Sequence, residues 1–198
     1  RTQEATFTLV GGSTVQVPMM NQRAKFDYAQ ADKLQVLRLP YVGEELSMII
    51  LLPSEADGIG QLEQMLSREN LEGWLNRLGE REVIVSVPKF EMTSKFSMEG
   101  VLRSMGMVRA FSDDADFSGM TGRRNLFLSA VIHQAYIDVN EEGTEAAAAT
   151  GAVMRLTSVG PERTPVFRAD HPFIFMIRED ISGSILFFGR VMNPQAGS

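Results

Sequence analysis

Two stretches decide the fold of this 198-residue chain: EEGTEAAAATGA at residues 141–152 and FRADHPFIFMI at residues 167–177. The first is long enough to form a strand but carries almost no side-chain bulk, so hydrophobic packing does little to hold it in one place. A segment of this kind is typical of chain that moves within a structure.

The charges of the first stretch are sorted by position. Successive side chains of a strand point to opposite faces, and every second residue from Thr144 to Leu156 is uncharged, whereas the other register holds Glu145 and Arg155. As a strand, the segment has one face that tolerates burial and one that tolerates water. A helix capped by Thr144 and ended by Gly151, or a disordered linker, is as consistent with the alanines.

Composition excludes several classes of protein. The formal charge of -6 argues against a nucleic-acid partner. Apolar runs such as residues 48–52 and 185–188 are far shorter than the roughly 20 residues of a membrane span, so no membrane partner is expected. The absence of cysteine excludes disulfides and a thiol nucleophile.

The apolar pattern predicts mainly strands with three helices between them. A hairpin is expected around Gly11-Gly12-Ser13. Residues 126–139 are apolar at both sets of alternating positions, which predicts a central strand with both faces covered and with Val131, His133 and Ala135 on one face. The predicted strands are 7–9, 15–17, 34–39, 46–52, 83–90 with a turn at Pro88, and 126–139. The predicted helices are 59–66, 71–78 before Gly79, and 98–105 before Gly106.

The usual catalytic and metal-binding patterns are weak. His133 and His171 are the two histidines, and neither a Gly-x-Ser-x-Gly elbow nor a His-Glu-x-x-His pair is present, so no enzyme activity is expected. Asp113, Asp114 and Asp116 lack the spacing of a calcium loop and predict a solvated turn. No metal or cofactor is predicted. His133, between apolar residues, is typical of a neutral, hydrogen-bonded core histidine.

Both opening stretches resemble one family. Residues 141–148 are similar to the reactive-loop hinge of the serpins, and residues 167–177 match the family signature at every position. Further matches in the family's order are at residues 21–23, 39–41, 47–53, 88–90, 116–120, 133–135 and 189–194. The chain resembles inhibitory, bacterial-type members of this family. The resemblance implies an α+β fold of antiparallel and mixed sheets, a few helices and an exposed reactive loop at about residues 141–165.

The matched segments correspond to the C-terminal half of a serpin. The resemblance therefore implies that residues 1–198 are the C-terminal part of a single serpin domain whose N-terminal half is absent, and that the missing half is a partner of this chain. It also favours an extracellular or periplasmic location, although no signal peptide is visible.

The implied function is inhibition of serine proteases by a suicide-substrate mechanism, in which the cut loop inserts into the central sheet and traps the acyl-enzyme. Family spacing places the scissile bond at Thr157-Ser158, with Arg155 and Leu156 as alternatives, and implies elastase-like, subtilisin-like or trypsin-like targets. The implied hinge comprises Glu141, Glu142, Gly143, Thr144, Glu145, Ala146, Ala147, Ala148 and Ala149.

The resemblance also assigns three structural positions. Lys89 and Glu141 match a salt bridge at the breach, where the loop first enters the sheet, and His133 matches the shutter, a polar cluster below the place where the sheet parts. A non-inhibitory serpin that carries a ligand or assists folding, an inactive fragment that proteases merely cut, and a plain β-rich binding module remain as alternatives.

Overall fold

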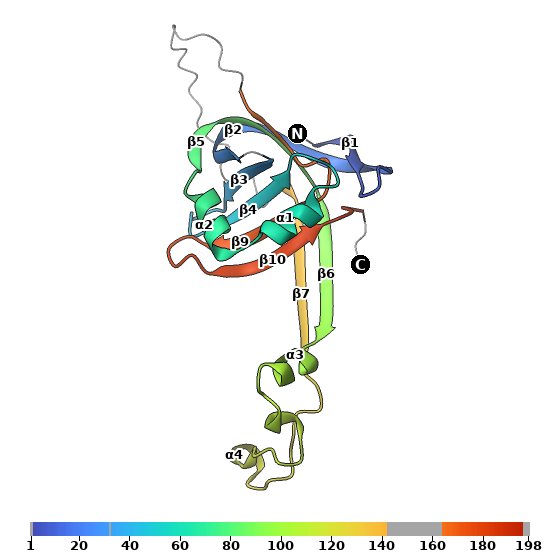
Figure 1. Ribbon diagram of the computed structural model, residues 1–198, viewed down its shortest axis with the longest axis vertical. Helices are drawn as coiled ribbons and strands as arrows, with labels where there is room; N and C mark the ends of the chain where they lie inside the picture. Colours follow the sequence, from blue (N-terminus) through green and yellow to red (C-terminus); the bar gives the residue numbers. More distant parts are fainter. Residues whose placement is uncertain (1, 32, 142–163, 196–198) are drawn as a thin grey trace. The chain divides into compact units, whose positions relative to one another are not determined.

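The computed structural model describes residues 2–31, 33–141 and 164–195 (Figure 1). It contains two compact units. Of the described residues, those up to 90 and those from 138 onward form the first unit, and residues 91–137 form the second.

The first unit is built on an eight-stranded sheet. Its order is β10-β9-β4-β3-β2-β5-β8, with β1 pairing beside β2. All pairs are antiparallel except β5 with β8, which are parallel. The strands are β1 (Thr2–Thr8), β2 (Thr14–Ala31), β3 (Leu34–Pro40), β4 (Leu46–Pro53), β5 (Gly79–Pro88), β8 (Val166–Arg168), β9 (Phe173–Glu179) and β10 (Ile185–Val191). The expected α+β class with antiparallel and mixed sheets is confirmed.

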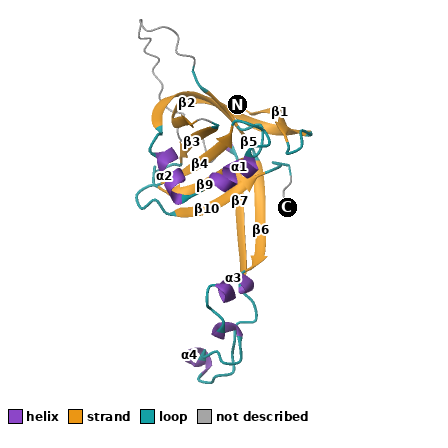
Figure 2. Cartoon of the chain, in the orientation of Figure 1, coloured by secondary structure: helices purple, strands orange, loops and turns teal. Residues whose placement is uncertain are grey.

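Two helices cover one face of this sheet, α1 (Ile59–Met65) and α2 (Arg68–Leu75) (Figure 2). Ile59 and Leu62 of α1 pack against side chains of β3, β4 and β9, and Trp74 of α2 adds to the same cluster. Strand β4 is buried at every residue but Leu46, as its continuous apolar pattern predicts for a strand with both faces covered.

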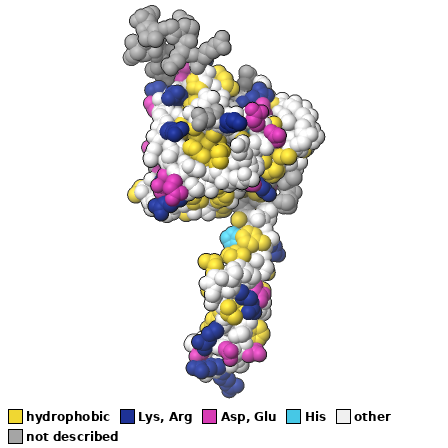
Figure 3. All heavy atoms as spheres, in the orientation of Figure 1, with side chains coloured by type: hydrophobic (Ala, Val, Ile, Leu, Met, Phe, Trp, Pro, Cys, Tyr) yellow, Lys and Arg dark blue, Asp and Glu magenta, His cyan; other side chains and the backbone are white. Residues whose placement is uncertain are grey.

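The second unit contains most of a two-stranded sheet, β6 (Phe90–Ser97) with β7 (Ile132–Val139). Between these strands lie α3 (Glu99–Ser104), the 3-10 turn η1 (Arg109–Phe111) and α4 (Ser118–Thr121). Apolar side chains on α3 remain accessible, and Met105 just beyond it is 78% exposed. Figure 3 shows hydrophobic side chains scattered over the visible surface of this unit.

The predicted strand at 126–139 is wrong in its first half, because β7 begins only at Ile132. Its partner β6 ends at Ser97, just before α3, so residues 126–131 pair with no strand in the part of the chain that the structure describes. They make single backbone bonds instead: Met98 N donates to Val131 O at 2.8 Å, and Leu128 N donates to Ala110 O at 2.8 Å. A strand without a ladder is not maintained by apolar pattern alone.

Two further boundaries differ from prediction. Helix α2 ends at Leu75, and Gly79 is the first residue of β5 rather than the end of a helix. Strand β2 continues from Thr14 to Ala31, well beyond the predicted residues 15–17, because β1, β5 and β3 pair with successive parts of it. Cross-strand pairing therefore extends a strand through polar residues such as Asn21 and Arg23.

Gly189 of β10 lies opposite Phe175 of β9, and the Phe175 ring occupies the space that a side chain at residue 189 would need. A Cβ at Gly189 would lie 2.8 Å from two atoms of the Phe175 ring, which is 3% exposed and has little room to shift. We expect Gly189→Ala to lower the free energy of unfolding by about 1–3 kcal/mol, measured by urea denaturation. Gly73→Ala in α2, where nothing lies within 4 Å, is the control and should stabilise the protein slightly. Equal effects of the two changes would contradict this reading of the packing.

Candidate functional site

The candidate site is a three-residue cluster at the start of the segment 141–149. Lys89 lies between β5 and β6, Glu141 lies two residues beyond the end of β7, and Thr2 begins β1. The ammonium group of Lys89 forms an ion pair with Glu141 Oε2, and the hydroxyl of Thr2 donates a hydrogen bond to Glu141 Oε1. Both carboxylate oxygens of Glu141 are therefore engaged by elements far apart in the chain.

These contacts stabilise the charged form of Glu141. The hydrogen bond from Lys89, then the one from Thr2, lower the pKa of Glu141 from 4.5 to about 2. A lowered folded-state pKa means that the carboxylate contributes to stability above the unfolded value, and that this contribution is lost as the pH falls from about 4.5 toward 2. The cluster therefore holds the start of segment 141–149 throughout the neutral range.

The titration of Glu141 tests this cluster. We expect its carboxyl carbon, followed by NMR, to titrate with a pKa of about 2, and Lys89→Ala to raise that value toward 4.5, since the main donor is removed. The control is Lys25→Ala, which removes an exposed ion pair with Glu80 at 3.4 Å and should leave Glu141 unchanged. A Glu141 titration that is the same in the parent and in Lys89→Ala would show that the ion pair does not hold the carboxylate.

The structure brings together the two residues assigned to the breach, and it adds Thr2. Sequence reasoning missed Thr2 because a single threonine at the start of an alternating strand carries no signal for a partner 139 positions away. The role of this cluster in loop insertion stays a prediction. Hinge residues 142–149 and the scissile-bond candidates Arg155, Leu156, Thr157 and Ser158 lie outside the described residues.

His133 differs from the core histidine expected from its neighbours. It lies on β7 and is exposed, with its ring centroid 5.1 Å from that of Phe96 on β6. A two-stranded sheet cannot bury the side chains on its faces unless another layer covers them. The shutter assignment of His133 stays a prediction.

The acidic residues near 113–116 form no metal site. Asp116 accepts hydrogen bonds from the backbone and hydroxyl of Ser118 at the start of α4 and pairs with Arg124 at 2.8 Å. These contacts lower the pKa of Asp116, the bonds from Ser118 first. Within the described part of the chain, no group of three or more His, Cys, Asp or Glu side chains is placed to hold a metal ion.

Among the helices that the structure describes, none has the length and apolar character of a membrane span.

Comparison with known proteins gives the family. The family model described as "Serpin (serine protease inhibitor)" matches residues 1–194. This chain belongs to the serpin family. It is 45% identical to the leukocyte elastase inhibitor of Bos taurus over 98% of the chain, and 44% identical to Serpin B3 of Homo sapiens over 90% of the chain. It is 44% identical to an uncharacterised serpin-like protein of Thermococcus kodakarensis over 99% of the chain.

A solved serpin structure has the same fold. Uncleaved ovalbumin superposes with a TM-score of 0.81 at 32% identity, over 98% of this chain and 48% of that one. The chain spans about half the length of the curated relatives it matches: 53% of the bovine inhibitor and 46% of Serpin B3 and the Thermococcus protein.

Proposed function

We propose that residues 1–198 form the C-terminal part of a serpin domain that inhibits serine proteases as a suicide substrate. The observation that carries the proposal is the hinge sequence at residues 141–149, which begins two residues after β7 with Glu141, the residue held by Lys89 and Thr2. The name of the bovine relative, leukocyte elastase inhibitor, supports the same class of function.

The strand order is compatible with insertion beside β7. Within the described residues β7 pairs only with β6, so its other edge carries backbone groups that an inserted strand can pair with. In the proposed mechanism a protease cuts the loop and forms an acyl-enzyme. The hinge then enters beside β7 with Thr144, Ala146 and Ala148 on the buried face, and the acylated protease is carried along and trapped.

The energy available for this step is large. Pairing ~10 inserted residues at roughly 1 kcal/mol net per hydrogen bond supplies on the order of 10 kcal/mol. This is comparable to the whole stability of an ordinary domain. The missing second neighbour of the inserted strand would come from the N-terminal half of the same fold, which we propose as the partner of this chain.

The target class depends on the scissile bond. Thr157-Ser158 suits elastase-like or subtilisin-like enzymes with a permissive specificity pocket. Cleavage after Arg155 suits trypsin-like enzymes, and cleavage after Leu156 suits chymotrypsin-like ones. An extracellular or periplasmic location stays a prediction.

The proposal is tested with a protein that carries both halves of the fold. Incubated with elastase-like, subtilisin-like and trypsin-like proteases, it should give a covalent complex that survives denaturing gel electrophoresis with at least one of them. Mass spectrometry of the released C-terminal peptide then identifies the scissile bond. Cleavage by all three proteases without any complex would leave a non-inhibitory serpin, or a mere substrate, as the function.

A further inference from the structure

His171 lies between two hydrogen-bond acceptors at the turn between β8 and β9. Its Nδ1 atom is 2.9 Å from Asp170 Oδ1, and its Nε2 atom is 2.6 Å from the backbone oxygen of Pro53, the last residue of β4. The side chain is only 13% exposed. Neither the breach cluster nor the proposed trapping mechanism uses this histidine.

The number of protons on the His171 ring decides whether both contacts can be hydrogen bonds. An ionised carboxylate and a backbone carbonyl only accept hydrogen bonds, whereas a neutral imidazole donates one proton and accepts at its other nitrogen. Neutral His171 would therefore leave one ring lone pair facing an acceptor oxygen. The imidazolium donates one hydrogen bond from each ring nitrogen, so both contacts are favourable.

We propose that His171 is a positioning residue whose imidazolium form clasps the β8–β9 turn to the end of β4, so that the hold on β8 depends on pH. The antiparallel pairing of β4 with β9 stops at Leu51 opposite Ile174, and the contact between His171 and Pro53 lies beyond that last pair. The clasp thus joins the end of β4 to the turn before β9, just beyond the point where the pairing of these two strands ends.

Strand β8 needs such a hold because it is short. It is a three-residue edge strand, paired in parallel to β5 and anchored by Phe167, which is fully buried. The turn that follows it is tied to two other strands: Ala169 N donates to Ser86 O of β5 at 2.9 Å, and Thr8 N of β1 donates to Asp170 O at 2.7 Å. Loosening this turn would therefore loosen β8, whose three residues come directly before it.

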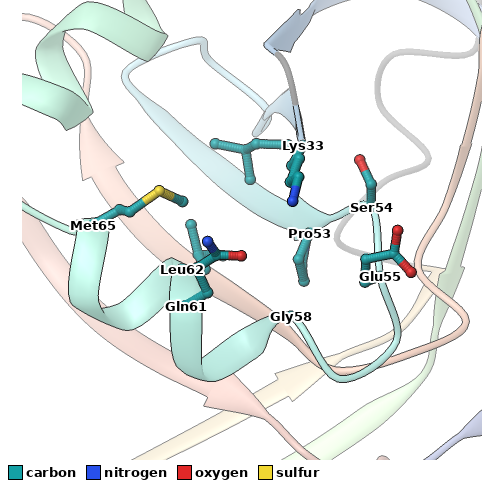
Figure 4. Close-up of a pocket in the computed structure, with 9 residues that line it drawn as sticks. Lys33, Pro53, Ser54, Glu55, Gly58, Gln61, Leu62 and Met65 are labelled. Atoms are coloured by element: carbon teal, nitrogen blue, oxygen red, sulfur yellow. The ribbon is translucent and has the colours of Figure 1, made fainter.

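The charges around His171 favour its protonated form. Burial lowers its pKa, but the hydrogen bonds with Asp170 and Pro53 and the negative charges of Asp170 and Glu55 outweigh burial and raise the pKa above 6.5. Arg168 pairs with the second oxygen of Asp170 at 3.0 Å and helps to keep that carboxylate ionised. Glu55 comes from the turn that leads from Pro53 to α1 (Figure 4).

The small pocket beside Pro53 does not offer another explanation for this arrangement. It is lined by Lys33, Pro53, Glu55 and neighbouring residues and has a volume of about 20 Å³ (Figure 4). That is room for little more than one water molecule. His171 is not among the residues that line the pocket, and both of its ring nitrogens face acceptor atoms of the protein.

The direction of the pH effect follows from the raised pKa. Stabilisation by protonated His171 is fully present below its unfolded value of about 6.5 and is lost as the pH rises through the higher folded value. Each unit by which the folded pKa exceeds the unfolded one corresponds to about a tenfold change in the opening equilibrium of the turn.

Amide hydrogen exchange tests the clasp in the chain as it stands. We expect the protection factors of Thr8 and Ala169 to fall as the pH rises from about 6 to 9, by up to about tenfold per unit of raised pKa, while amides of the β3–β4 ladder keep theirs. His171→Gln does not titrate, and its single amide nitrogen cannot lie at both ring-nitrogen positions, so it should show the lower protection at every pH. His133→Gln, on β7, should keep the pH profile of the parent.

A second measurement does not depend on His171→Gln being folded. With two histidines in the sequence, ring-nitrogen NMR gives two titrations, and His133→Gln assigns them. At pH 6.5, more than half of the His171 rings should carry protons on both nitrogens, because the pKa of His171 is raised above that value. A His171 titration at or below pH 6.5, or identical exchange profiles in the parent and in His171→Gln, would overturn the proposal; neither result depends on whether the protein inhibits a protease.

Discussion

Residues 1–198 alone are expected to be cut near Arg155 to Ser158 by elastase-like, subtilisin-like and trypsin-like proteases, and to form no covalent complex with any of them. The inserted hinge would pair with β7 on one side, but no other strand of the described chain lies beside β7 to receive its second edge. About half of the backbone hydrogen bonds gained on insertion would be lost, roughly 5 of the ~10 kcal/mol.

The same open edge should make the isolated chain associate. Ile132 and Tyr136 on β7 are 61% and 56% exposed, and the β10 residues 185–188 are each at least 39% exposed. Apolar strands of this kind bind other chains or aggregate. Denaturing gels after incubation with each protease, and sedimentation of the chain alone, check both outcomes. A complex that survives denaturation would show that the second neighbour is not required.

The second large effect concerns the hinge, in a protein that carries both halves of the fold. Thr144→Arg or Ala146→Arg is expected to convert an inhibitor into a substrate, because each lies on the register that must be buried on insertion. A lone buried charge there costs several kcal/mol and slows a step that must outrun deacylation of the protease. The measurement is the fraction of cut protein found in the covalent complex.

Glu145→Arg is the matched control, since it places the same side chain on the opposite, water-facing register. It should retain most of the complex formed by the parent. Equal loss at residues 144, 145 and 146 would show that strand register does not govern this segment.

Much of the first unit could be predicted from local pattern. Gly11 and Gly12 both adopt positive φ, at 87° and 84°, and the hairpin expected around them is present because glycine reaches this conformation without strain. Strand β4 was predicted from continuous apolar sequence, and its burial on both faces is the condition that such a sequence requires. Helix α1 follows from its apolar spacing, as does α3 of the second unit.

Residues 126–131 could not be predicted correctly, because their state depends on a neighbour rather than on their own pattern. Their apolar character is compatible with a strand, but β6 turns into α3 before it can pair with them. The register of β2 with β1, β3 and β5 likewise depends on cross-strand partners that local propensity does not encode.

By itself, the sequence determined the elements whose cause is local: the glycine turn, the doubly apolar β4 and the charge-free register of the hinge. Its motifs also determined the family and pointed to Lys89 and Glu141. Only the tertiary structure decided which distant groups complete these sites: Thr2 on Glu141, and Pro53 on His171. The physical reason is that a hydrogen bond between residues more than 100 positions apart depends on chain path and strand register, and the side chains that form it carry no periodic signal of their own.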